Sequence, residues 1–76
     1  MENLRQMRIR LSDAGLVPDL RQHFERSGFV TNRIGDDVVE VWQPGVSDET
    51  EAVRAVEGHL TVWRAMHPGA NAELTQ

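Results

Sequence analysis

The amino-acid sequence predicts an α+β fold in the order strand, helix, strand, strand, helix. Three observations predict it. Apolar and polar residues alternate over 7–11, and β-branched residues dominate 38–42. Apolar residues recur at helical spacing over 16–24 and 52–63. Glycine, proline and aspartate cluster between these segments, where turns are expected.

The first strand is expected over 7–11, where three apolar residues alternate with two arginines. Successive side chains of a strand point to opposite faces of its sheet. The apolar side chains should therefore face a core, and Arg8 and Arg10 should lie on the other face.

The first helix is expected to follow a break at 12–15 and to run to about residue 26. Its apolar stripe consists of Leu16, Val17, Leu20 and Phe24. Pro18 is tolerated in a first helical turn, where its missing N–H is not needed. Gly28 suits the left-handed position after a helix end.

Two strands joined by a short turn should follow. Residues 29–34 are rich in β-branched and aromatic residues, residues 35–37 form a turn cluster, and residues 38–42 read as a second strand. So short a connection predicts an antiparallel hairpin. Pro44 and Gly45 then end the second arm.

The second helix is expected to start at Ser47 or Asp48, and the pair Asp48 and Glu51 resembles a capping box. It should run to about Met66. Its apolar stripe consists of Ala52, Val53, Val56, Leu60 and Trp63. Gly58 inside this helix suggests a close packing contact. Residues 67–69 end the helix.

These elements are most simply folded as a ferredoxin-like βαββα two-layer sandwich, with a three-stranded sheet and both helices on one face. A right-handed crossover makes the first strand parallel to a later one. The first strand should lie beside the third, and the second strand outside. The first strand is then an open edge. The expected boundaries are an N-terminal extension at 1–6, the domain at 7–69, and a C-terminal tail at 70–76 that could form a short extra strand.

Two runs resemble those of a known group. Residues 20–30, Leu-Arg-Gln-His-Phe-Glu-Arg-Ser-Gly-Phe-Val, resemble the helix-to-strand junction of small ferredoxin-like proteins. Residues 39–44 followed by 48–52 resemble their strand-to-helix passage. Small signal-transducing proteins related in fold to nitrogen-regulatory proteins share this layout. The resemblance spans about residues 7–67. It implies the fold and a regulatory role, and it transfers no functional residue.

Composition narrows the class of protein. The chain has 76 residues, no cysteine, and a net charge of −4 from 12 acidic and 8 basic residues, all of the latter arginine. A domain of this size buries only roughly 60% of its unfolded surface, so self-association is an expected source of stability. The sequence contains neither a long apolar run nor a secretory start, so we expect a cytoplasmic protein without a membrane span. The negative charge disfavours general nucleic-acid binding.

The uncovered face of the sheet is the predicted binding surface. Glu40 and Trp42 should point outward from the third strand and share that face with Arg8 and Arg10; Arg33 of the second strand is added to them. Tryptophan stacks on rings, and arginine holds phosphate or carboxylate. The alternative interpretation is that this tryptophan covers the exposed sheet or packs within a homodimer. Both interpretations remain open at the sequence level.

Other polar groups indicate no chemistry. The three histidines, at 23, 59 and 67, lack the spacing of a joint metal site and are expected at the surface or at helix ends. Asp36 and Asp37 fit turn chemistry. Residues 12–15 lack the glycines of a phosphate loop. We expect no catalytic residue, no metal and no cofactor.

Three hypotheses for function follow. The first is a non-enzymatic interaction or regulatory module that forms a homodimer through the open sheet face or the first-strand edge. The second is single-stranded nucleic-acid or nucleotide binding on the sheet face. The third is an acidic docking partner that presents residues 36–57 to a basic protein.

Overall fold

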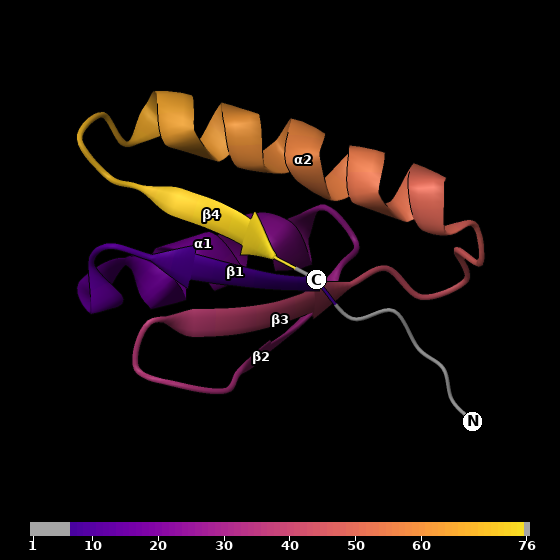
Figure 1. Cartoon of the computed structure of the whole chain (residues 1–76), viewed down its shortest axis with the longest axis horizontal. Helices are drawn as coiled ribbons and strands as arrows, with labels where there is room; N and C mark the ends of the chain where they lie inside the picture. Colours follow the sequence, from indigo (N-terminus) through magenta and orange to yellow (C-terminus); the bar gives the residue numbers. More distant parts are fainter. Residues whose placement is uncertain (1–6, 76) are drawn as a thin grey trace.

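Four strands form one antiparallel sheet in the order β2-β3-β1-β4 (Figure 1). The computed structural model describes residues 7–75, so the predicted extension at 1–6 lies outside the described residues. Along the chain the elements are β1 (Met7–Leu11), the short 3-10 helix η1 (Ala14–Leu16), α1 (Val17–Arg26), β2 (Val30–Arg33), β3 (Val38–Trp42), α2 (Glu49–Met66) and β4 (Ala72–Thr75).

The two predicted helices form where their boundary residues indicate. The carboxylate of Asp48 caps α2 and accepts hydrogen bonds from the backbone amides of Thr50 (2.9 Å) and Glu51 (3.3 Å). Pro18 lies in the first turn of α1. Gly28 follows its end with a φ of +91°, a conformation that favours glycine. These caps explain why both helices begin and end close to the predicted positions.

The sheet differs from the prediction in having four strands rather than three. Residues of the predicted tail form β4, which pairs with β1 in the register Arg8↔Thr75 to Leu11↔Ala72. β1 is consequently an interior strand between β3 and β4, and the predicted open edge at the first strand is wrong. The outer strands of the described sheet are β2 and β4. β1 and β2 run in the same direction with β3 between them, so the first strand is parallel to a later one, as expected.

The hydrophobic core lies between the sheet and the two helices. Alternate residues of β1 and β3 are buried, as the period of two predicted, and both helices place their apolar stripes against them. The thirteen apolar core residues are Met7, Ile9, Leu11, Val17, Leu20, Phe24, Phe29, Val39, Val41, Val56, Leu60, Trp63 and Ala72. Both helices therefore cover the same face, and within residues 7–75 no helix lies over the opposite face of the sheet, which we call the outer face.

One face of α2 is buried and the other is exposed. Val56, Leu60 and Trp63 point into the core, whereas Val62 and Met66 are 51% and 61% exposed. A Cβ added at Gly58 would meet nothing within 4 Å, so the expected close packing at this glycine is wrong. In residues 7–75, neither helix combines the length and apolarity needed to cross a lipid bilayer.

Candidate functional site: the outer face of the sheet

The outer face is built from alternate residues of all four strands. The register places Thr75, Arg8, Glu40 and Asn32 in one row across the sheet. A second row, nearest the β2–β3 turn, consists of Glu73, Arg10 and Val38. A third row, at the other end of β3, consists of Trp42 and Val30. Of the predicted site residues, Arg8, Arg10, Glu40 and Trp42 are therefore on one face.

The charges of the outer face alternate in sign across the strands. Arg8 and Glu40 face each other in register, with 3.8 Å between Nε and Oε2. The Arg8 side chain is 56% exposed and the Glu40 side chain 15% exposed. Arg10 stands opposite Glu73 of β4. Each arginine thus has an acidic neighbour on an adjacent strand, which reduces the positive potential available to a phosphate.

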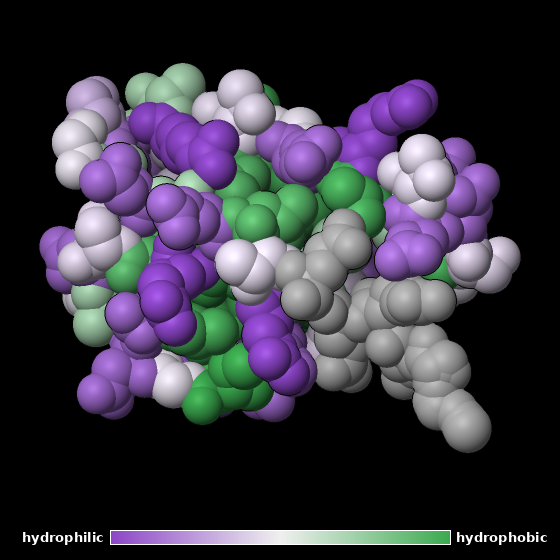
Figure 2. All heavy atoms as spheres, in the orientation of Figure 1, coloured by the Kyte–Doolittle hydropathy of each residue, from purple (hydrophilic) through white to green (hydrophobic). Residues whose placement is uncertain are grey.

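Two apolar pairs lie on the outer side of β2 and β3, one on each side of the row that holds Glu40 and Asn32. Trp42 pairs in register with Val30, which is 38% exposed. Ile34 donates its amide to the Val38 carbonyl at 3.0 Å and is 44% exposed. Hydrophobic surface lies between hydrophilic side chains over the strands in Figure 2. We call these two pairs together, Val30 with Trp42 and Ile34 with Val38, the apolar strip, which Glu40 and Asn32 interrupt.

Arg33 is not part of this surface, and its predicted place there is wrong. It pairs with the buried Val39, so it lies on the helix side of the sheet at the edge of β2. Its guanidinium donates hydrogen bonds to the carbonyls of Gly35 (3.0 Å) and Asp36 (2.8 Å). Arg33 therefore closes the β2–β3 turn.

The histidines form a second cluster that sequence spacing did not reveal. His23 of α1 and His59 of α2 have ring centroids 5.6 Å apart, and the His59 ring also lies 5.3 Å from that of Phe29. The Nε2 of His23 is buried and has no hydrogen-bond partner among the described residues. Burial, together with the neighbouring His59, lowers the pKa of His23 below 6.5.

The third histidine joins the ends of both helices. His67 stacks on Trp63 with ring centroids 4.3 Å apart, and its Nδ1 lies 3.0 Å from the Trp63 carbonyl. Its Nε2 lies 3.2 Å from the Asp19 carboxylate, which also accepts a hydrogen bond from the Trp63 indole at 3.3 Å. The Trp63 carbonyl and Asp19 together raise the pKa of His67 above 6.5. Both ring nitrogens face acceptors, so this pair is suited to an ion pair rather than to proton transfer.

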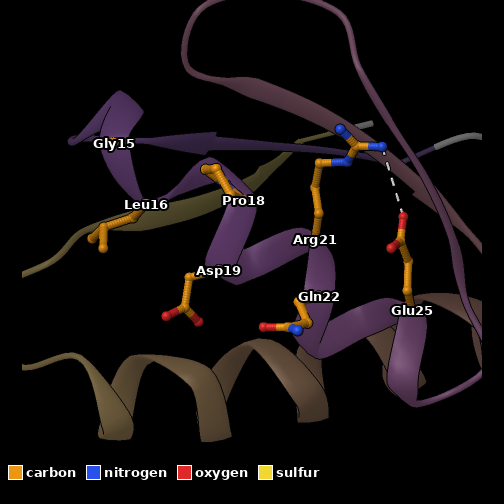
Figure 3. Close-up of a pocket in the computed structure, with 7 residues that line it drawn as sticks. All are labelled: Gly15, Leu16, Pro18, Asp19, Arg21, Gln22 and Glu25. Carbon is orange, nitrogen blue, oxygen red and sulfur yellow. Dashed lines mark ion pairs between the residues drawn. The ribbon is translucent and has the colours of Figure 1, made fainter.

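An open depression lies along the exposed side of α1 (Figure 3). Asp19 and Gln22 point toward α2, whereas Arg21 and Glu25 extend toward the strands. Arg21 Nε donates to the Thr31 hydroxyl (3.1 Å), and that hydroxyl donates to Glu25 (2.5 Å). Arg21 and Glu25 are also an ion pair at 3.7 Å. These charged groups bind one another and tie α1 to β2.

The remaining predicted features are local structure. Asp13 accepts the Gly15 amide at 2.9 Å, so residues 12–15 are a capped turn. The acids of 36–57 are divided among the β2–β3 turn, the outer face and α2; the turn lies at one end of the sheet, and α2 begins at the other (Figure 1). They do not form one acidic surface. Within residues 7–75, no three metal-binding side chains come together.

Comparisons of the chain with protein-family models, with curated proteins and with solved structures each found no match.

Proposed function

We propose that this protein is a non-enzymatic interaction module that self-associates through the outer face of its sheet. The observation that carries this proposal is the apolar strip on a face that neither α1 nor α2 covers. Val30, 38% exposed, pairs with Trp42 at one end of the strip, and Ile34, 44% exposed, adjoins Val38 at the other end. Exposed apolar and aromatic side chains among charged ones are typical of surfaces that bind other proteins.

The charge pattern of the outer face fits a second copy of the same chain. In a two-fold interface each patch contacts itself, so the patch must be self-complementary. Arg8 and Arg10 on the interior strand alternate with Glu40 and Glu73 on its two neighbours. A rotated copy can therefore place acid against base on both sides of the axis, which favours one register over others. The first-strand edge plays no part in this proposal, because β4 covers it.

Size-exclusion chromatography with light scattering tests the proposal. The wild-type chain is expected to be a dimer at high micromolar concentration. Trp42→Arg and Ile34→Lys each place a charge in the apolar strip and should give a monomer with an unchanged far-UV circular dichroism spectrum. A wild-type chain that is strictly monomeric at several hundred micromolar would overturn the proposal.

Val62→Lys supplies the matched control. Val62 is 51% exposed, more than Ile34, but lies on α2 on the other side of the molecule. This variant introduces the same charge in place of an exposed β-branched residue and should remain a dimer. If Val62→Lys dissociated the dimer and Ile34→Lys did not, the interface would lie on the helical side.

Binding of single-stranded nucleic acid or nucleotides is the second candidate function. It is favoured by Arg8, Arg10 and Trp42 sharing one face. The acidic neighbours Glu40 and Glu73 and the net charge of −4 weigh against it. Oligonucleotide titration followed by Trp fluorescence tests it, since Trp63 is fully buried and should respond little. Salt-dependent quenching would support binding, and its absence would exclude this function.

We also propose a ferredoxin-like classification for the fold. It is supported by the position of β1 between β3 and β4 and by the two helices on one face. The distribution of acids described above weighs against the third hypothesis, an acidic docking partner.

A further inference from the structure

All three histidines of the chain lie where α1 meets α2, and the proposed self-association uses none of them. His23 and His59 come from different helices, and their rings meet at 69° with centroids 5.6 Å apart. The Phe24 ring centroid lies 5.6 Å from that of His23 and 5.9 Å from that of His59, and the Phe29 centroid lies 5.2 Å from that of Phe24 and 5.3 Å from that of His59. The histidine pair is thus part of an aromatic cluster that holds the helices together.

Protonation is unfavourable at this position for reasons of geometry. The buried Nε2 of His23 would carry an N–H without an acceptor among the described residues. Among the described residues, the ionisable groups that act on His23 are His59 of α2, His67 at the C-cap of α2, and Asp19 of α1. Asp19 is the only one that favours the charged ring, and its carboxylate already accepts hydrogen bonds from His67 and Trp63. A second charge on His59 would add repulsion across the same contact.

We propose that the His23–His59 pair is an acid-sensitive joint between α1 and α2, which opens when His23 takes up a proton. The ligand that this pair would respond to is the proton. Opening would separate the aromatic cluster and bring the imidazole into contact with water. This inference does not depend on the proposed self-association, because both helices belong to one chain.

The sign of the effect follows from linkage. Burial depresses the folded-state pKa of His23 below 6.5, so the unfolded chain binds the proton more readily below that pH. Stability due to this histidine is present above pH 6.5 and is lost as pH falls toward its folded-state pKa. His67 acts in the opposite direction, because its pKa is raised above 6.5. Stability due to His67 is complete below pH 6.5 and is lost as pH rises.

Urea unfolding at a series of pH values from about 5 to 8 tests the proposal. For one proton taken up on unfolding, the unfolding equilibrium constant rises at most about tenfold per pH unit. The wild-type chain should show a rise below pH 6.5. His23→Phe keeps a ring in the aromatic cluster and removes the titrating group, so it should flatten this part of the profile. His67→Phe, the control, should leave the rise of the unfolding equilibrium constant below pH 6.5 in place.

Two further measurements make the test decisive. Ring NMR titrations should show His23 titrating below 6.5, together with acid-induced changes at Trp63 fluorescence in a Trp42→Phe background. His59→Phe and His23→Leu replace His23→Phe if that variant fails to fold. The proposal would be overturned if the unfolding equilibrium constant rose equally below pH 6.5 in the wild type and in the folded His23 variants. A His23 pKa that is not lowered below 6.5 would overturn it too.

Discussion

The carboxylate of Asp19 lies 3.2 Å from the Nε2 of His67 and joins the first turn of α1 to the residue that caps α2. The two residues are 48 positions apart in the sequence. Trp63 completes the contact, because its indole donates to Asp19 and its ring stacks on His67. This contact joins the start of α1 to the end of α2. The aromatic cluster around His23 and His59 joins the same two helices further along α1.

Removing the charge of Asp19 should destabilise the fold in a pH-dependent way. The Trp63 carbonyl and Asp19 raise the folded-state pKa of His67, so its contribution to stability is present below pH 6.5 and lost as pH rises. Asp19→Asn should therefore lower the melting temperature more at pH 6 than at pH 9. His67→Phe retains a ring against Trp63 and should likewise lower the melting temperature more at pH 6 than at pH 9. Thermal unfolding at both pH values checks this, and an equal loss at pH 6 and pH 9 would contradict it.

The N-cap of α2 should contribute measurably to stability. Asp48→Ala leaves the amides of Thr50 and Glu51 without their side-chain acceptor and should cost about 1 kcal/mol. For a domain of this size that corresponds to a fall in melting temperature of roughly 4–8 °C. Ser47→Ala at the preceding position is the matched control and should change little. Differential scanning calorimetry makes the comparison. An equal fall in melting temperature in both variants would show that the Asp48 side chain does not act as the cap.

The core should tolerate loss of a methyl group but not of an aromatic ring. Ile9 and Phe24 are both fully buried. Ile9→Val should cost about 0.5–1.5 kcal/mol and leave a folded protein, whereas Phe24→Ala should cost about 3–5 kcal/mol. The larger loss is comparable with the whole stability of a small domain, typically about 5 kcal/mol at the low end. Urea unfolding measures both. A cooperative transition of Phe24→Ala near the wild-type midpoint would show that the packing is misassigned.

Arg64 should protect the outer edge of β4. Its guanidinium donates through Nε (3.0 Å) and through the terminal nitrogen to the Ala72 carbonyl, which lies on the side of β4 away from β1. Arg64→Gln should uncover this carbonyl and loosen β4, because the strand loses its hydrogen bonds to α2. The uncovered edge should also invite pairing with other chains.

Hydrogen exchange should then be faster in the amides of β4 in Arg64→Gln, and the variant should aggregate more readily on concentration. Arg54→Gln, on the exposed part of α2, is the control for lost charge. Unchanged exchange in β4 would show that Arg64 does not stabilise the edge.

The sequence predicts five of the seven elements because each has a local signal. β1 and β3 alternate cleanly, and both helices have apolar stripes with recognisable ends. β4 lacks such a signal, since Ala72 and Glu73 are poor strand formers and only four residues pair. Its formation depends on β1 and Arg64, which are distant in the sequence. η1 is a turn that Asp13 tightens into a short helix.

The candidate site was predictable where strand phase is unambiguous. Val39 and Val41 fix the phase of β3, so Glu40 and Trp42 could be placed on the outer face. The phase of β2 is ambiguous because Phe29, Val30 and Thr31 are all suited to burial, so the sequence alone does not place Arg33 on the correct face. The histidine pair depends on how two helices approach each other, and spacing within one helix cannot predict that. The available signal was that His23 and His59 each precede a stripe residue, Phe24 and Leu60.

The pairing of β4 with β1 also sets an order of folding events. Arg8 and Thr75 are 67 positions apart, so β4 can dock only after a long loop is closed, whereas the β2–β3 hairpin forms locally. During synthesis β4 leaves the ribosome after every other element described. Until it docks, β1 has an uncovered edge and the molecule is the three-stranded sheet that local patterns predict. That species would be the one most exposed to aggregation and to chaperones.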